Sequence, residues 1–315
     1  MSNRLISIII ATAGKGGYLI SCLESLNLQS HKTLETIVID NSSDPELRAK
    51  LCRVYPQITV YRPKDKLDFC RSMNLGIASS SGEFVLCLND DVTLDSNFIE
   101  SALKGFQAAS NIGMVSGKIL RPDGKTIDST GLFVSRFRTA GERGYNRRDK
   151  GQFDEAGYVF GASGACAFYR KEMLGEVKAA GGYFDEDYGF FYEDLDIAWR
   201  AQRLGWKGYY VPQALAYHAR GATARSNAPG LSRFSRSYLN DELHFDLIKN
   251  RYLTVIKNEK LLDLLSHLPF LVFYDLLSFG YLLIFRPKLF VYFFTKPVPV
   301  LTAVRKRFNS CGIRK

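Results

Sequence analysis

Short apolar runs alternate with amphipathic segments over the first 120 residues of the chain. Runs rich in β-branched residues predict buried strands at 5–10, 36–40, 58–61, 84–88 and 113–116. Between them, apolar residues at helical spacing predict helices at 17–29, 71–79 and 97–108. This alternation, with short connections, predicts an α/β fold whose mostly parallel central sheet is covered by helices on both faces.

The pattern weakens between residues 121 and 160, and five arginines lie among glycines from 136 to 148. We expect a long mobile loop here rather than a separate domain. Regular patterning resumes afterwards, with a helix at 194–204, a strand at 207–211 and an extended segment at 214–218. These segments complete a first domain that we place at residues 1–235.

Residues 236–315 form a second part of different character, helical and basic. The run 268–285 is almost wholly apolar, but it contains Asp275 and is short for a membrane span, which needs about 20 residues. From residue 251 onward, eleven Lys/Arg face only three Asp/Glu. An apolar helix beside basic clusters predicts attachment to an anionic membrane surface. A true span, a soluble appendage and a homodimer contact are the alternatives.

Composition narrows the setting. The formal net charge of +10 indicates an anionic partner, either nucleic acid or lipid, and the apolar C-terminal runs favour lipid over nucleic acid. The six cysteines include no C-x-x-C pair, which is typical of reduced thiols in the cytosol. The first apolar run is too short for a signal peptide. We therefore expect a cytoplasmic protein, peripheral at the inner face of the cell membrane.

Polar residues follow the predicted strands where parallel sheets bind their ligands. Thr12 and Asp40 end the first two strands, and Asn89-Asp90-Asp91 ends the fourth. Adjacent carboxylates on such a turn suit Mg²⁺ or Mn²⁺, which share oxygen ligands with substrate phosphates. The alternative for Asp90-Asp91 is a polar turn that caps the next helix.

Two further motifs carry candidate chemistry. Glu193 and Asp194 open a predicted helix, where the helix dipole alone favours acidic residues. The aromatic residues before them would partly desolvate a carboxylate, which raises its pKa and suits it as a general base. His218 ends an extended segment and is a candidate metal ligand that favours Mn²⁺.

Taken in order, these motifs resemble glycosyltransferase family 2 and its GT-A fold over roughly residues 4–255, with the bacterial rhamnosyltransferase-like branch most similar. The strand ending at Asp40 resembles the family's first nucleoside-binding motif, and Asn89-Asp90-Asp91 resembles its D-x-D position. Residues 161–165 resemble the small-residue segment before the acceptor site. Glu193-Asp194 is similar to the family's E-D motif, whose Asp serves as base.

The resemblance implies a role for each matching residue. The implied roles are donor contacts by Thr12, Asp40, Arg71, Asn74 and Asp90, metal coordination by Asp91 and His218, acceptor contacts by Gly161, Ser163, Tyr192 and Glu193, and proton removal by Asp194. The implied reaction is an inverting, Mn²⁺- or Mg²⁺-dependent transfer of a sugar from a nucleoside-diphosphate sugar. The implied nucleotide is dTDP or UDP, and rhamnose is the candidate sugar. The implied acceptor is a growing cell-surface glycan, such as lipopolysaccharide, on a lipid carrier.

The chain departs from the family pattern in two places. The segment before Asn74 includes Arg71 where the family often has a glycine-rich stretch. Residues 202–206 do not match the Q-x-x-R-W motif of processive synthases, which indicates addition of a single sugar.

Two rival functions use some of the same features. A nucleotidyltransferase acting on sugar phosphates would need a glycine-rich phosphate loop with a nearby arginine, and residues 13–17 lack that arginine and the G-K-[ST] of a P-loop. A non-catalytic protein that binds an acidic polymer would explain the basic segments. It would not explain Glu193-Asp194 together with His218.

Overall fold

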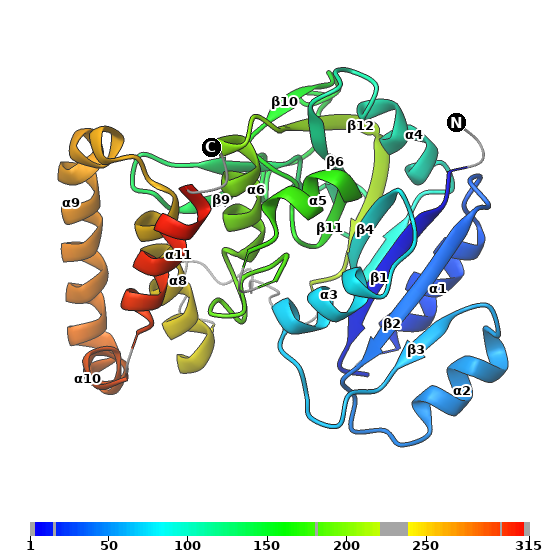
Figure 1. The fold of residues 1–315 in the computed structure, drawn as a ribbon, viewed down its shortest axis with the longest axis horizontal. Helices are drawn as coiled ribbons and strands as arrows, with labels where there is room; N and C mark the ends of the chain where they lie inside the picture. The colour runs from blue at the N-terminus through cyan, green and yellow to red at the C-terminus, as the bar shows by residue number, and fades with distance from the viewer. Residues whose placement is uncertain (1–3, 15–16, 180–181, 221–238, 297, 312–315) are drawn as a thin grey trace.

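The computed structural model describes residues 4–14, 17–179, 182–220, 239–296 and 298–311. A central sheet with flanking helices forms the larger part, and a group of C-terminal helices lies at one end of it (Figure 1).

The main path of the sheet has the order β10-β12-β6-β11-β4-β1-β2-β3. Its strands are β1 Ile6–Thr12, β2 Leu34–Asp40, β3 Thr59–Tyr61, β4 Phe84–Asn89, β6 Ile112–Leu120, β10 Gly157–Val159, β11 Cys166–Arg170 and β12 Lys207–His218. Strands β3, β2, β1 and β4 run parallel, as do β6 and β12, whereas β11 lies antiparallel between β4 and β6. The predicted mostly parallel sheet is confirmed.

Helices pack on both faces of this sheet, as predicted. They are α1 Tyr18–Asn27, α2 Leu47–Val54, α3 Phe69–Ala78, α4 Phe98–Gly105, α5 Lys171–Val177 and α6 Glu193–Arg203. Because side chains alternate along a strand, Ile8 and Ile10 of β1 join the core under α1, α2 and α4, while Ile9 joins the core under α3, α5 and α6. The sheet therefore lies between two apolar cores, and these fix the positions of the polar residues at the carboxyl ends of its strands.

The arginine-rich segment 121–160 is more regular than a long loop. It contains β7 Ile127–Ser129, β8 Leu132–Val134, β9 Ala140–Glu142 and β10. Strand β7 extends the main sheet through β6, and β8 pairs with β9 in a separate two-stranded sheet. The Arg143 guanidinium lies 4.7 Å from the ring centre of Tyr210, so cation–π contacts help to fix this segment. The expectation of an unstructured loop is wrong.

The C-terminal part consists of α8 Asp241–Asn258, α9 Leu261–Phe285, α10 Pro287–Thr295 and α11 Val300–Cys311. Helices α8 and α11 pack against each other, and Leu253 and Ala303 join the core beneath α6. The domain boundary that we expected at 235/236 lies outside the described residues. Of the described helices, α9 is long and apolar enough to cross a membrane, a weak criterion that core helices also meet.

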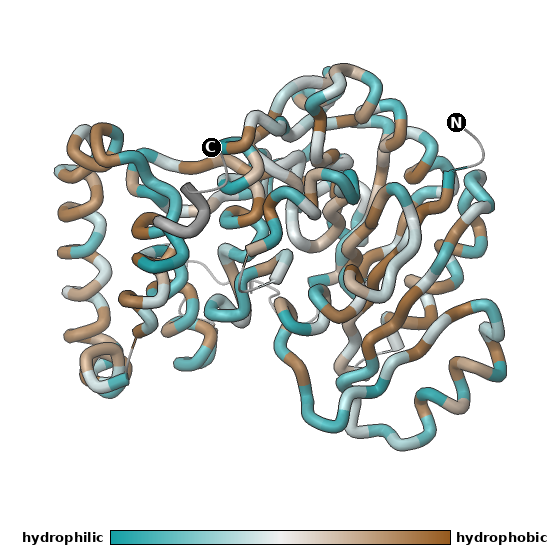
Figure 2. The backbone as a smooth tube through the Cα atoms, viewed as in Figure 1, coloured by the Kyte–Doolittle hydropathy of each residue, from teal (hydrophilic) through white to brown (hydrophobic). Residues whose placement is uncertain are grey.

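Helix α9 differs from a core helix in its exposure. Only 11% of the most apolar 18-residue stretch of α9 is buried. The helix forms the outer edge of the molecule and is coloured largely as hydrophobic in Figure 2. Asp275 is not directed at lipid, because its carboxylate pairs with Arg251 of α8 at 2.6 Å. The Asp275 charge, which we took as evidence against a membrane span, therefore lies on the face of α9 that packs on α8.

Five of the six cysteines have side chains that the structure describes. Cys22, Cys70, Cys87 and Cys166 are buried and Cys52 is exposed, and all five are free thiols. Burial raises the pKa of each buried thiol above its ordinary value, so these groups are held as neutral core residues.

Candidate active site

Asp90 and Asp91 form the turn between β4 and a short strand, β5 Val92–Leu94. The turn enters a strand, and α4 begins only at Phe98, so the pair does not cap a helix. Thr12 of β1 donates a 2.6 Å hydrogen bond from Oγ1 to Asp90 Oδ2. Burial raises the pKa of Asp90, and the bond from Thr12 opposes that shift. Thr12 and Asp90, predicted as donor contacts, are therefore neighbours.

The pairing of β5 with β12 brings His218 to this turn. His218 lies opposite Val92 in the antiparallel register, one residue from Asp91. Its Nε2 is 3.2 Å from Asp91 Oδ1, and its Nδ1 is 2.8 Å from Asp128 Oδ2. The two predicted metal ligands are thus adjacent in space although 127 positions separate them in the sequence.

Asp128 anchors the far side of the imidazole. It is fully buried and also pairs with Arg121 and Arg220, each through Nε at 2.6 Å. Burial acts to raise the pKa of Asp128, but His218 and Arg220 outweigh it and lower the pKa to about 2. Asp128 is therefore a fixed anion that orients His218.

This donor set fits a divalent cation. Two cis ligands of an octahedral ion with bonds of about 2.1 Å lie about 3 Å apart, close to the separation of Asp91 Oδ1 and His218 Nε2. A carboxylate on the second nitrogen is the usual partner of a metal-binding histidine. The described residues contain no group of three His, Cys, Asp or Glu placed to hold a metal, so the remaining ligands would come from substrate and water.

Asp40 ends β2 and has an available acceptor. Its Oδ1 receives a 2.8 Å bond from the Ser42 amide, which fixes the carboxylate. Its Oδ2 is buried and has no hydrogen-bond partner within the described residues, although Arg62 Nη1 lies 3.5 Å away. An unsatisfied buried acceptor is unfavourable, and a nucleobase N–H would satisfy it.

The predicted base belongs to a group of three carboxylates. Asp194, in the first turn of α6, accepts a 2.9 Å bond from the Gly164 amide. Glu193 beside it is buried, and Glu142 of β9 completes the group. Burial and mutual repulsion raise the pKa of Glu142 to about 7 and raise that of Glu193 strongly. Burial also raises the pKa of Asp194, which suits a general base.

The small-residue segment supports these carboxylates. Ser163 is buried and donates a 2.8 Å bond to Glu142, and a Cβ at Gly164 would lie 3.2 Å from Asp194 Oδ2. Gly161 has a different reason to be small, since a Cβ there would lie 2.5 Å from that of Ala198 on α6. Gly161 therefore has a packing role, and its predicted acceptor contact stays untested.

Asn74 and Arg71 contact the catalytic loop, here defined as residues 182–192. The Asn74 side chain exchanges two 2.8 Å bonds with the backbone of Phe184. Arg71 is half exposed, and its Nε lies 3.3 Å from Glu186. These bonds give Asn74 a structural role in the loop, and its predicted donor contact stays untested, as does that of Arg71.

The loop is held from behind by the C-terminal helices. Asn250 of α8 is fully buried, and its Nδ2 lies 2.9, 2.7 and 2.8 Å from the carbonyl oxygens of Tyr188, Phe190 and Phe191. Phe191 and Tyr192 have positive φ, of 71° and 69°, a conformation that non-glycine residues seldom adopt. Asn250 therefore stabilises a strained turn that ends directly before Glu193 and Asp194.

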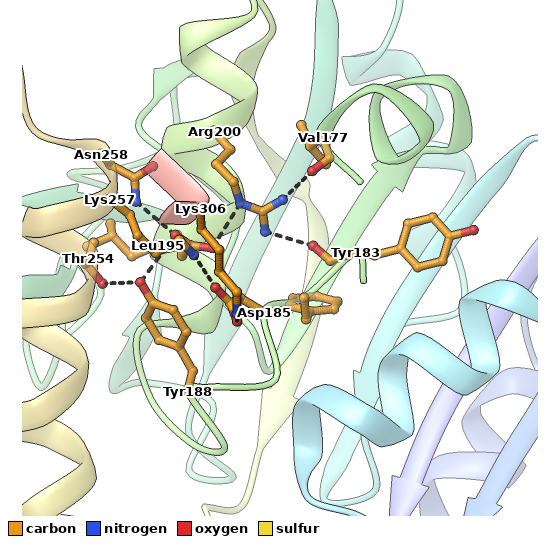
Figure 3. A network of polar contacts seen from close by, with 12 residues as sticks. Val177, Tyr183, Asp185, Tyr188, Leu195, Arg200, Thr254, Lys257, Asn258 and Lys306 are labelled. Atoms are coloured by element: carbon orange, nitrogen blue, oxygen red, sulfur yellow. Dashed lines mark hydrogen bonds and ion pairs between the residues drawn. The ribbon is translucent and has the colours of Figure 1, made fainter. Parts of the chain in front are cut away.

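A buried ion network fixes the same loop (Figure 3). Asp185 pairs with Lys257 of α8 at 2.6 Å and with Lys306 of α11 at 2.5 Å. Asp196 of α6 pairs with Lys257 at 2.8 Å and with Arg200 at 2.9 Å. Helices α8 and α11 thus contribute to the scaffold of the site.

Arg220 connects the metal candidates with the carboxylates. It pairs with Asp128, and its charge lowers the pKa values of Glu142 and Asp194 against the dominant effect of burial. Hydrogen bonds make the same connection, because Ser129, next to Asp128, donates to Glu142, and the Asn89 amide donates a 3.0 Å bond to Ala165, next to Gly164. The strand-end turn, His218 and the base therefore surround one region.

Residues 7–178 match the model of the glycosyl transferase family 2. The chain belongs to that family. It is a glycosyltransferase with a GT-A fold, and it transfers a sugar from a nucleotide sugar to a glycan acceptor.

The proteins that this chain resembles include two named bacterial glycosyltransferases. The chain is 24% identical over 259 residues to the N-acetylglucosaminyl-diphospho-decaprenol L-rhamnosyltransferase of Mycobacterium tuberculosis, covering 74% of this chain and 82% of that protein. It is 25% identical over 228 residues to the amylovoran biosynthesis glycosyltransferase AmsB of Erwinia amylovora, covering 69% and 71%.

Solved structures share the fold at low identity. The mannosyltransferase PcManGT from Pyrobaculum calidifontis, in complex with GDP-Man and Mn²⁺, aligns with a TM-score of 0.56 and 13% identity over 98% of this chain and 85% of its own. GalNAc-T7 with UDP, GalNAc and Mn²⁺ aligns with a TM-score of 0.61 and 14% identity over 81% and 49%. Both were solved with a divalent metal.

Sequence patterns missed several residues of the site. Asp128, Glu142 and Arg220 lie in or beside segments with weak periodicity, where no strand was predicted. Asn250 and Lys257 lie in the part of the chain that we predicted to be helical, but no local signal shows that their helix packs behind the loop. No local signal separates Asp128 and Glu142 from the other acidic residues between the D-x-D turn and the E-D motif.

Proposed function

We propose that this glycosyltransferase adds a single sugar, with inversion, from a dTDP- or UDP-linked donor to a hydroxyl of a lipid-linked cell-surface glycan. Rhamnose is the first donor sugar to test, because the similar mycobacterial protein is named an L-rhamnosyltransferase that uses a decaprenol-linked acceptor. The same name supports a lipid carrier. The observation that carries the mechanism is the contact of Asp91 with His218, together with the bonds from the Asn89 amide to Ala165 and from the Gly164 amide to Asp194.

The donor is held at the carboxyl ends of β1, β2 and β4. Asp40 offers its unsatisfied Oδ2 to an N–H of the nucleobase, and Thr12 and Asp90 face the nucleoside and diphosphate. A cavity of about 480 Å³ beside Asp91, lined also by Tyr18 and Tyr217, gives space next to this turn. Its volume is within the range of ordinary ligand sites.

Asp91 and His218 would hold Mn²⁺ or Mg²⁺ against the donor diphosphate. When bound, such an ion neutralises negative charge on the phosphate oxygens and so helps the nucleoside diphosphate to leave. Asp128 holds a proton on His218 Nδ1, so Nε2, which lies 3.2 Å from Asp91 Oδ1, is the nitrogen whose lone pair would bind the ion.

Asp194 is the base. Its carboxylate accepts the proton of the acceptor hydroxyl while that oxygen forms a bond to the anomeric carbon. The bond from the anomeric carbon to the diphosphate oxygen breaks on the opposite face, so one displacement inverts the carbon. The raised pKa of Asp194 strengthens it as a base, and the Gly164 amide fixes its orientation.

The acceptor approaches from the side of the aromatic loop. Tyr192 and Glu193 precede Asp194, and both are buried, so they border the base rather than bulk solvent. The exposed apolar face of α9 would place the site near a lipid-linked substrate at the cytoplasmic face of the membrane. A homodimer through the same face is the competing role for α9.

A donor screen tests the proposal. Thermal unfolding is measured with a panel of dTDP-, UDP- and GDP-sugars, each with Mn²⁺, with Mg²⁺ and with EDTA. We expect a metal-dependent rise in Tm with one nucleotide class, followed by slow hydrolysis of that donor without acceptor. Absence of both binding and hydrolysis for every member would contradict the proposed function.

A further inference from the structure

A cavity of about 570 Å³ lies between α8, α9 and the β8–β9 hairpin. It is separate from the cavity beside Asp91, and its size is that of a site for a ligand of moderate length. Aromatic and aliphatic side chains form most of its walls, among them Phe137, Leu247, Phe273 and Leu277. None of the roles proposed above for donor, metal or base uses this space.

The outer end of the cavity opens on the apolar face of α9. Phe273 and Leu277 line the cavity, yet they are 57% and 59% exposed. They belong to a continuous set of exposed apolar residues along α9, including Leu276 at 69% and Leu283 at 57%. A hydrocarbon chain that leaves a membrane under this face would therefore enter the cavity without crossing water.

The inner end of the cavity reaches the catalytic helix. Tyr192 lines the cavity, is only 6% exposed, and is the N-cap residue of α6. Asp194 follows two positions later. One cavity thus connects the exposed apolar face of α9 with Tyr192, two residues before the candidate base.

The charges in the wall favour a hydrocarbon occupant over a phosphate. Arg251 is the one Arg or Lys among the described lining residues, and it is already bonded to Asp275 at 2.6 Å and to the Phe137 carbonyl at 2.8 Å. A charge that is paired in this way offers little to an anionic headgroup. The apolar walls, by contrast, gain free energy from each methylene that they bury.

We propose that this cavity holds the hydrocarbon chain of the lipid-linked acceptor. The chain lies between α8 and α9, and the sugar that it carries extends past Tyr192 to Asp194. This assignment rests on the proposed function, because it needs an acceptor with a lipid carrier. It goes further by naming the site that selects that carrier, and it distinguishes this site from general contact of α9 with a membrane.

Photolabelling tests the assignment directly. The probe is farnesyl diphosphate with a benzophenone at the end of its isoprenoid chain, and the full chain is labelled in detergent. We expect labelled peptides from 244–252 and 273–281, and competition by undecaprenyl phosphate but not by inorganic diphosphate or dioleoylphosphatidylglycerol. Equal competition by the phospholipid would overturn the proposal, because the cavity would then be a general lipid contact.

Two neighbouring leucines provide a matched pair of variants. Leu277→Asp places a charge in the cavity mouth, whereas Leu276→Asp places it on the same exposed helix outside the lining. We expect Leu277→Asp to reduce labelling at least about tenfold and Leu276→Asp to leave it nearly unchanged. Ser278→Trp, which fills the cavity without adding charge, should act like Leu277→Asp. Equal labelling of all three variants would overturn the proposal.

Donor hydrolysis without acceptor, measured on the same proteins, separates the two proposals. If the wild-type protein hydrolyses a nucleotide sugar but its labelling does not depend on Leu277 or Ser278, the cavity assignment fails and the proposed function stands. If no donor is bound or hydrolysed, the proposed function fails, and labelling still decides whether the cavity takes an isoprenoid.

Discussion

Asp128 accepts a 2.8 Å hydrogen bond from His218 Nδ1, and the other nitrogen of the ring lies 3.2 Å from Asp91. The carboxylate therefore sets which nitrogen of His218 carries its proton and which one faces the D-x-D turn. Asp128, which no sequence motif indicated, thus orients His218, which a motif did indicate. This relationship leads to the first prediction.

Asp128→Asn should weaken the apparent affinity for Mn²⁺ by about 10- to 100-fold, because a neutral amide no longer fixes the imidazole. Mn²⁺ titration of donor hydrolysis measures this affinity. Since Asp128 also neutralises Arg121 and Arg220, thermal unfolding must show that the variant is folded. Exposed Asp65→Asn is the control for loss of one carboxylate. Unchanged Mn²⁺ dependence would remove Asp128 from the metal site.

Asp194→Asn should lower kcat for transfer by about 10²- to 10⁴-fold, the usual contribution of a positioned base. Donor affinity should stay within about twofold, because the carboxylate acts on the acceptor hydroxyl. The amide keeps the shape of the side chain but accepts no proton. Calorimetric titration with the nucleoside diphosphate and Mn²⁺ provides the comparison. Loss of donor binding in place of turnover would refute its role as base.

The raised pKa of Glu142 makes a prediction about stability. Burial and the charge of Asp194 raise it from an ordinary 4.5 to about 7, so the folded state favours the protonated carboxyl. Its stabilising contribution is complete below pH 4.5 and is lost as the pH rises through 7. Glu142→Gln removes this dependence and should gain stability relative to wild type, by up to about 3 kcal/mol, between pH 4.5 and 8.

Urea unfolding at several pH values measures this difference. Glu155→Gln, at an exposed position, corrects for the loss of one negative charge. Glutamine can still bond to Ser163 and Ser129, so the hydrogen-bond geometry is largely kept. A difference that stays constant from pH 4.5 to 8 would mean that Glu142 is ionised normally in the folded protein.

Asn250 should act on catalysis through the loop that it holds. Its amide group bonds three loop carbonyls, so Asn250→Ala should cost about 1 to 3 kcal/mol of stability and lower kcat. Asn250→Asp should be worse than alanine, because it turns a carboxylate oxygen toward those carbonyls. Donor affinity should change little in either variant. If kcat is unchanged while stability falls, the loop does not position Asp194.

The sequence predicted the parts of the site that local patterns encode. Strands that end in polar residues placed Thr12, Asp40 and Asp90-Asp91 at one sheet edge, and helical periodicity placed Asp194 at a helix start. The register of β5 against β12, which brings His218 to Asp91, depends on tertiary pairing and a bulge in β12. No periodicity within one segment reports such a pairing.

The packing of the C-terminal helices on the site could not be predicted for the same reason, because it depends on contacts between distant segments. The apolar run in α9 and the basic residues near the end favoured a membrane-attached appendage, and the exposure of α9 is compatible with that interpretation. The ion pairs of Lys257 and Lys306 with Asp185 are buried contacts between distant segments. A basic residue in such a pair has the same local sequence signal as one that faces an anionic surface, so only the fold separates the two.

Lys306→Met separates these two roles of the C-terminal helices. Lys306 Nζ bonds Asp185 and Asp187 at 2.5 and 2.7 Å, so its loss leaves Asp185 with Lys257 alone and loosens the catalytic loop. We expect lower stability and several-fold lower kcat/KM on a soluble acceptor. Sedimentation with anionic vesicles should be unchanged, because α9 keeps its apolar face.

Deleting residues 261–315 should abolish both properties, since it removes α9 together with Lys306. Exposed Arg305→Met is the matched control, because it removes a neighbouring charge without touching Asp185. If Lys306→Met and Arg305→Met weaken vesicle binding equally and leave kcat/KM intact, the basic tail serves the membrane alone. If only Lys306→Met lowers kcat/KM, α11 completes the active site from the far end of the chain.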